Sequence, residues 1–191
     1  MQYKLSIVRF EILVIAILGF TIMAGTASQA FAASDYFLKI EGVAGESNDD
    51  KHKGEIQIES WSFGASQSGS MAMGGGGGAG KVSMQDFSIT KHVDKSSPKL
   101  FESLVTGQHL KEAKLVIRSA GGSQVEYLVI TLSDVLVSSY STGGSSGDDR
   151  PMESVSFNFS QIKMSYVEQD AKGSAGAATE FGWDLKANKK V

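Results

Sequence analysis

Residues 75–81 have the glycine spacing and final lysine of a phosphate-binding loop. In such loops, backbone amides and the lysine hold the phosphates, and a Ser or Thr hydroxyl binds Mg²⁺. Here Val82 stands at the hydroxyl position, and the residues after it alternate like a strand, whereas a phosphate loop opens a helix. The segment is therefore interpreted as a flexible, glycine-rich loop, and no cofactor is predicted.

The three histidines, His52, His92 and His109, lie in separate segments. None has the close spacing that places two metal ligands on one face of an element, and the chain has no cysteine. No metal site is predicted, and solvated or capping roles are expected for the histidines. His52 sits in the charged turn 49–53, where it is expected to face water.

Catalytic patterns are weak. Serine is abundant, but no G-x-S-x-G elbow occurs, and a serine nucleophile needs an identifiable base. The acidic clusters at 46–50 and 148–150 have the residue types of paired glycosidase carboxylates, but turn formation explains them more simply. No catalytic residue is predicted, and a hydrolase remains a distant alternative.

Aromatic and methionine side chains suit contacts better than chemistry. Trp61, Phe63 and Trp183 are expected to pack in a core or an interface, because aromatic rings bury large areas. Met71 and Met73 lie in the glycine-rich segment, where flexible thioethers suit an adaptable protein contact.

The elements that carry these residues are mostly strands. Apolar and polar residues alternate with a period of two, which is typical of sheets, in segments 36–40, 56–63, 82–89, 113–118, 124–140, 155–166 and 181–186. The alternation changes phase near Gln161, which predicts a bend with one extra residue, a β-bulge. The fold class is therefore mainly β, and a closed or nearly closed antiparallel barrel is expected because closure hides strand edges.

One helix is predicted. Ser97 is its expected cap, Pro98 fits the first turn, where its missing N–H does no harm, and Gly107 ends it. The apolar residues between recur every three or four positions: Leu100, Phe101, Leu104 and Val105. The helix is expected to cover an open face of the sheet.

The first 32 residues have the features of a signal peptide. Lys4 and Arg9 precede an apolar run at 12–23, and small residues lead to a predicted cleavage between Ala32 and Ala33. The run is shorter than the roughly 20 residues of a membrane-spanning helix, so no stable membrane anchor is expected. Residues 33–191 then form one exported domain, periplasmic or extracellular.

Charge and composition limit the kinds of partner that this protein is expected to bind. Removing Lys4, Arg9 and Glu11 with the leader changes the net charge from −3 to −4, without a basic cluster. Nucleic acid is not expected as a partner, because neutralising phosphates requires clustered Lys and Arg. The absence of cysteine excludes disulfides, thiolate metal sites and a lipidated cysteine.

Almost the whole predicted mature domain resembles the Hcp family, the tube proteins of type VI secretion. The resemblance rests on five segments in one order: FLKIEGVAGES, HKGEIQIESWSFG, GGGGGAGKVSMQDFSITKHVDKSSPKL, LSDVLVSSYSTGG and GWDLKANKKV. It implies an antiparallel β-barrel of two packed sheets with one flanking helix and an extended loop. It also implies six-membered rings that stack into a tube, with a sheath, a spike protein and effectors as partners.

The resemblance also suggests which residues make these contacts. The glycine-rich loop 66–81 is similar to the family's extended loop that reaches the next ring, with these candidates: Ser70, Met71, Met73, Gly75, Gly78 and Lys81. Strand edges in 35–43 and 155–166 are candidates for contacts within a ring, represented by Tyr36, Lys39, Glu41, Phe157, Phe159 and Lys163.

One departure from the family pattern leaves two functions open. Tube proteins of this family assemble in the cytosol without a signal peptide, whereas this chain is predicted to begin with one. The favoured function is a self-assembling tube subunit. The alternative is an exported Hcp-like binding or adhesion module that acts outside the secretion apparatus.

Overall fold

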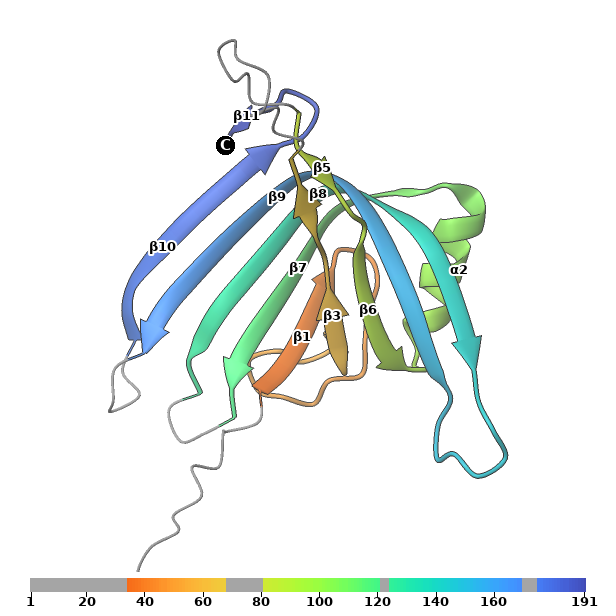
Figure 1. Ribbon diagram of the computed structural model, residues 1–191. Helices are drawn as coiled ribbons and strands as arrows, with labels where there is room; N and C mark the ends of the chain where they lie inside the picture. The colour runs from red at the N-terminus through yellow and green to blue at the C-terminus, as the bar shows by residue number, and fades with distance from the viewer. Residues whose placement is uncertain (1–33, 68–80, 121–123, 170–174) are drawn as a thin grey trace, which may run out of the picture. The chain divides into compact units, whose positions relative to one another are not determined.

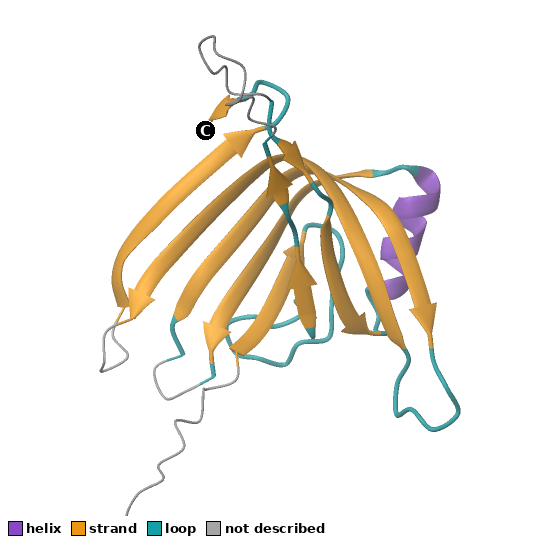
Figure 2. Cartoon of the chain, in the orientation of Figure 1, coloured by secondary structure: helices purple, strands orange, loops and turns teal. Residues whose placement is uncertain are grey.

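The computed structural model describes residues 34–67, 81–120, 124–169 and 175–191, all within one unit of the chain (Figure 1). Its strands are β1 (Ser34–Ile40), β2 (Ile56–Gln57), β3 (Ser60–Ser62), β4 (Ala65–Ser66), β5 (Ser83–Met84), β6 (Phe87–His92), β7 (His109–Ser119), β8 (Glu126–Gly143), β9 (Met152–Gln169), β10 (Ala175–Asp184) and β11 (Lys189–Lys190). A single described helix, α2 (Ser97–Thr106), lies beside them (Figure 2). The prediction of a mainly β fold with one helix is confirmed.

The main sheet curls back on itself. Strands β7, β8, β9 and β10 form an antiparallel meander, β1 pairs with β7, and β6 pairs with the first half of β9. Segment 56–62 joins the two ends, because Ile58 N–H donates to Tyr36 O at 3.2 Å and Glu59 N–H donates to Thr90 O at 2.8 Å. The pairing therefore runs from β1 round to β6 and returns to β1, in a nearly closed barrel.

The core fills the inside of this barrel. Alternate side chains of β1 and β7 meet those of β6 and β9 in one buried cluster, as in the packing of two sheet layers. Leu38, Leu115, Ile130, Phe87 and Phe157 are almost completely buried there. The alternation seen in the sequence thus selects the inward-facing residues of each strand.

The hairpin β8–β9 bends where the change of phase predicted it. Buried positions shift on both strands: Leu132 and Val135 on β8, Phe159 and Ile162 on β9. The predicted bulge in β9 is wrong, because Gln161 still pairs with Ser133 in the register of the neighbouring pairs. Both strands change face together, and the irregularity in their ladder lies on β8, between Val137 and Ser139.

Asp134 makes the bend. Its φ of 52° is left-handed, a region that Asp tolerates better than most residues. Its carboxylate accepts hydrogen bonds from Lys186 Nζ at 2.6 Å, Ser160 Oγ at 2.5 Å and His109 Nδ1 at 2.7 Å. These donors hold the pKa of Asp134 well below its usual range. One side chain thus links β7, β9 and the C-terminal segment at the bend.

Helix α2 and its N-cap each begin one residue earlier than predicted. Ser96 is the N-cap residue, and Ser97 is the first helical residue, whose hydroxyl bonds outside the helix. Gly107 ends the helix with a left-handed φ of 64°, as predicted. Leu100 is fully buried where α2 packs against β8. Within the described ranges, no helix has the length and apolar character needed to cross a bilayer.

Gly45→Ala is expected to destabilise the domain by about 1–3 kcal/mol, because the new side chain would have no space. An added Cβ would overlap the backbone oxygen of Glu55, in a loop closed by the Gly45 N–H to Gly54 O bond of 2.8 Å. Urea denaturation followed by circular dichroism measures the change. Gly147→Ala is the control, because its Cβ would meet nothing within 4 Å.

Candidate functional site

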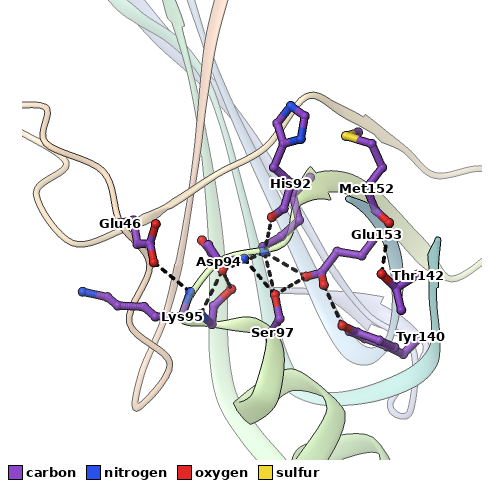
Figure 3. A network of polar contacts seen from close by, with 11 residues as sticks. Glu46, His92, Asp94, Lys95, Ser97, Tyr140, Thr142, Met152 and Glu153 are labelled. Carbon is purple, nitrogen blue, oxygen red and sulfur yellow. Dashed lines mark hydrogen bonds and ion pairs between the residues drawn. The ribbon is translucent and has the colours of Figure 1, made fainter. Parts of the chain in front are cut away.

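A buried polar network joins β6, β9 and the start of α2 (Figure 3). At its centre lies Lys91, a fully buried side chain of β6. Its Nζ is 2.8 Å from Glu153 Oε1 and 2.7 Å from Asp94 Oδ1, and it also donates to His92 O at 2.7 Å. The network thus contains one cation between two carboxylates, inside the domain.

Hydroxyl groups complete the network. Ser97 Oγ donates to Glu153 Oε1 at 3.0 Å, and Tyr140 OH donates to Glu153 Oε2 at 2.6 Å. Burial and the Glu153 carboxylate raise the pKa of Tyr140 to about 12, so its hydroxyl remains a donor. Lys91 Nζ donates to Ser97 Oγ at 3.3 Å as well as to the carboxylates, so it is not placed to accept a proton from the serine. This arrangement favours a structural role over hydrolysis.

A second buried charge lies on the outer face of the sheet. Arg118 of β7 is 3% exposed and holds two carboxylates, Asp35 Oδ2 at 2.8 Å and Asp49 Oδ2 at 2.7 Å. Its guanidinium lies 4.9 Å from the centre of the Phe37 ring, within the range of a cation–π interaction. Through Asp49, Arg118 ties the loop 44–55 to the sheet. No pattern in the sequence predicts this role for Arg118.

His52 belongs to the same cluster, and the prediction that it faces water is wrong. The side chain is only 4% exposed, because its ring stacks on Phe37 with 4.2 Å between centroids. Its Nδ1 lies 2.9 Å from Glu55 Oε2. The turn interpretation of its neighbours is confirmed, since Asp49 Oδ1 accepts the amide of Lys51 at 3.0 Å.

Other candidates for chemistry have structural contacts. Asp148 Oδ2 accepts the amide of Ser145 at 2.9 Å, as expected of a turn. Trp61 and Phe63 stack with Phe87, so their predicted packing role is confirmed, and Trp183 stacks with Phe181. Across the part of the chain that the structure describes, no three His, Asp or Glu side chains form a group able to hold a metal ion.

The three candidate ring contacts at β1 differ in exposure. Tyr36 is half-buried against the core, and its carbonyl is already bonded to Ile58. Lys39 and Glu41 are exposed, and Glu41 Oε2 lies 3.9 Å from Lys111 Nζ in an open ion pair. Lys39 and Glu41 are therefore accessible to another molecule, and their role in a ring stays a prediction.

The candidate ring contacts on β9 do not lie on an exposed edge strand. Phe157 and Phe159 are buried in the barrel, so their side chains serve the domain's own core. Strand β9 pairs with β8 on one side and with β6 and β10 on the other, so it is not an edge strand. Lys163 is exposed and pairs with Glu180 across β9 and β10 at 2.8 Å.

Most of the candidate stacking loop lies outside the described residues, including Ser70, Met71, Met73, Gly75 and Gly78. Lys81 is described and exposed, just before β5. On either side of this segment, β4 and β5 pair through Ala65–Met84 and Ser66–Ser83.

Two apolar surfaces that combine half-buried and exposed side chains were not predicted. The first, named here the β10 face, consists of Leu128, Met164, Tyr166, Phe181 and Trp183 on β8, β9 and β10. The second, named the helix face, consists of Val93, Pro98, Phe101, Val105 and Tyr140 around α2. Large exposed apolar areas commonly mark binding surfaces. These two are the strongest candidates for a functional site.

Known proteins share this sequence and fold. A family model described as "Type VI secretion system effector, Hcp" matches residues 37–166. Protein hcp1 of Pseudomonas aeruginosa is 54% identical over 158 residues, which cover 82% of this chain and 98% of that protein.

Solved structures agree with this match. The structure of a type six secretion system protein has a TM-score of 0.79 and 36% identity, covering 83% of this chain and all of the other. Hcp1 from Salmonella typhimurium has a TM-score of 0.70 and 39% identity, covering 83% and 99%. The family model, the sequence identity and the fold together show that this chain belongs to the Hcp family of type VI secretion proteins.

Proposed function

We propose that this chain is a structural subunit of a type VI secretion tube. Six copies form a ring, rings stack into a tube, and the tube is exported with effectors, next to the sheath and the spike protein of the apparatus. The observation that carries this proposal is the 54% identity to an Hcp protein over nearly that protein's full length. The subunit works by assembly and performs no catalysis.

An open strand edge supports self-assembly. Strand β11 pairs only with Trp183 and Asp184, which leaves the outer edge of β10 without a strand partner over residues 175–181 within the described structure. That stretch has one charged residue, Glu180, and no proline. Edges with so little protection readily accept another chain.

The test of this function is the mass of the mature domain, residues 33–191, in solution. We expect light scattering to give about six times the chain mass, and electron microscopy to show rings and short tubes. A monomer at every concentration tested would contradict the proposal.

We also infer that residues 1–32 are a signal peptide. N-terminal sequencing of the protein recovered outside the cells should begin at Ala33. Recovery from a strain without the contractile apparatus separates the two functions left open by the sequence. Loss of the external protein in that strain supports the tube, whereas unchanged export supports an exported binding module.

Deleting residues 74–78 is expected to leave ring formation intact and to abolish stacking. This segment is five glycines, which bury no side chain, so the barrel should keep its stability. If loop 66–81 reaches the next ring, it must keep its full length to do so. Electron microscopy of the deletion variant should therefore show single rings in place of tubes. Replacing the same glycines by serines keeps the length and is the control. Normal tubes from the deletion would exclude the loop from stacking.

A further inference from the structure

The buried histidine of the loop 44–55 lies between two carboxylates from different segments. His52 Nδ1 is 2.9 Å from Glu55 Oε2, and His52 Nε2 is 3.6 Å from Glu126 Oε1, at the start of β8. The His52 side chain is 5% exposed, so water has little access to its ring. Each ring nitrogen therefore lies next to a negative charge that solvent does not screen well.

The protonation state of His52 decides how many of these contacts are favourable. A neutral imidazole has a single N–H, which Glu55 can accept at 2.9 Å. Its Nε2 then has no hydrogen bond among the described residues, and its lone pair faces the Glu126 carboxylate. The imidazolium has two N–H groups, so it can donate to Glu55 and attract Glu126 at the same time.

The charges around the ring also favour the imidazolium. The described side chains in this cluster are four carboxylates and one permanent cation: Asp35, Asp49, Glu55, Glu126 and Arg118. Four negative charges and one positive charge give −3, which protonation of His52 changes to −2. Burial opposes this, because a charge loses its hydration, but two carboxylates within 4 Å of the ring outweigh that cost. Lys51 and Lys53, beside His52 in the chain, are exposed to water.

The loop 44–55 is attached to the sheet by two charged contacts of different kinds. Arg118 is charged at every ordinary pH, and it lowers the pKa of Asp49 to about 2, so their contact persists in neutral and mildly acidic solution. Histidine, in contrast, usually changes its charge between about pH 5 and 8. We propose that His52 is a pH-sensitive latch. When protonated, it ties the loop 44–55 to the start of β8, and when it loses its proton, it releases this part of the loop while Arg118 keeps Asp49 in place.

The latch makes the domain more stable in mild acid than in mild base. With two carboxylates beside the ring, the folded state holds the proton of His52 more tightly than the unfolded chain does. Unfolding therefore releases protons, and the stability falls as the pH rises. The contribution of Asp49 has the opposite sign, because it is lost as the pH falls toward 2. Since the chain is proposed to be exported, the loop would respond to the pH of the surroundings.

Hydrogen exchange of the loop 44–55, followed by mass spectrometry, tests the latch. The amides of this loop should exchange faster in His52→Gln than in the wild type. The ratio of the two rates should be about fivefold larger at about pH 5 than at about pH 8, the factor that corresponds to one net hydrogen bond. Comparing the two proteins at the same pH cancels the pH dependence of exchange itself. An equal ratio at both pH values would overturn the latch.

Glu126→Gln is a second variant that leaves the stacking of His52 on Phe37 intact. Glu126 is 36% exposed, so this variant should fold, and its amide oxygen can still accept a hydrogen bond. Urea denaturation of the wild type, both single variants and the double variant gives the coupling between positions 52 and 126. The coupling should be present at about pH 5 and nearly absent at about pH 8. The same coupling at both pH values would show a contact that does not depend on charge, and would contradict the proposal.

His109→Gln is the matched control. His109 is 65% exposed and pairs with Asp134, away from the loop 44–55, so this variant should exchange like the wild type in that loop at both pH values. Light scattering of every sample distinguishes a loop released by His52 from one released when an assembly dissociates. If the pH effect disappears between samples in the same state of assembly, His52 is not the latch, and the proposed tube function is unaffected.

Discussion

Lys91→Met is expected to lower the free energy of unfolding by about 3–5 kcal/mol, the usual cost of removing one partner of a buried ion pair. Without the ammonium group, the Glu153 carboxylate stays fully buried with no cation beside it. Asp94 also loses the cation that lies closest to its carboxylate. Because domains of this size are stable by about 5–15 kcal/mol, this is a large fraction of the total. Urea denaturation monitored by circular dichroism measures it.

The double variant Lys91→Met/Glu153→Gln is expected to regain most of the loss. The amide oxygen introduced at position 153 would still accept a hydrogen bond from Tyr140 or Ser97, and the amide carries no charge to bury. Lys99→Met is the surface control, since the exposed Lys99–Glu102 pair contributes little. If the double variant is as unstable as Lys91→Met, uncompensated charge is not the cause.

Arg118→Met is expected to have the second large effect, about 1.5–3 kcal/mol, the usual contribution of a hydrogen bond to a charged group. Asp49 and Asp35 lose their shared buried partner, but both carboxylates are themselves partly exposed. The loop 44–55 should loosen with it, which limited proteolysis would detect as a new cleavage. Arg118→Lys keeps the charge but cannot donate two parallel bonds to Asp49, so an intermediate stability is expected. Equal stability of wild type and Arg118→Met would contradict this role.

The ion pair between Arg118 and Asp49 predicts that the stability of the domain depends on pH. Hydrogen bonds from Arg118 lower the pKa of Asp49 from its ordinary 3.8 to about 2. A lowered folded pKa gives stability that is present above the unfolded pKa and is lost as the pH falls through the folded one. The stability difference between wild type and Arg118→Met should therefore narrow between about pH 4 and 2. A constant difference across that window would exclude the Asp49 contribution.

Local signals in the sequence account for most elements of the fold. The helix is set by Pro98, Gly107 and the apolar spacing between them, and strands such as β1 and β6 follow from alternation. The bend at Asp134 was visible as a phase change in β9. The sequence did not reveal how the bend forms. The phase change on β8 and the positive φ of Asp134 can be interpreted only when the pairing of the two strands is known.

Contacts between distant segments explain why some predictions from the sequence were wrong. His52 looks solvated in a charged turn, but its burial depends on Phe37, a residue of another strand. Phe157 and Phe159 look like edge residues until β6 and β10 are known to flank β9. The β10 face was missed for the opposite reason. Tyr166 and Phe181 alternate like core residues, and no periodicity distinguishes an apolar residue buried by its own chain from one left open.

The order in which the strands pair has a consequence for how the chain folds. Strands β7 to β10 each pair with the next strand along the chain, so only short loops have to close in this meander. In contrast, Ile40 of β1 pairs with Ala113 of β7, which lies 73 residues later in the chain. At about 5–20 residues per second, the ribosome takes about 4–15 seconds to deliver that partner. We expect the meander to form the folding nucleus and the N-terminal strand to dock late. The amino-terminal strand of the domain would then be the last part of this protein to fold.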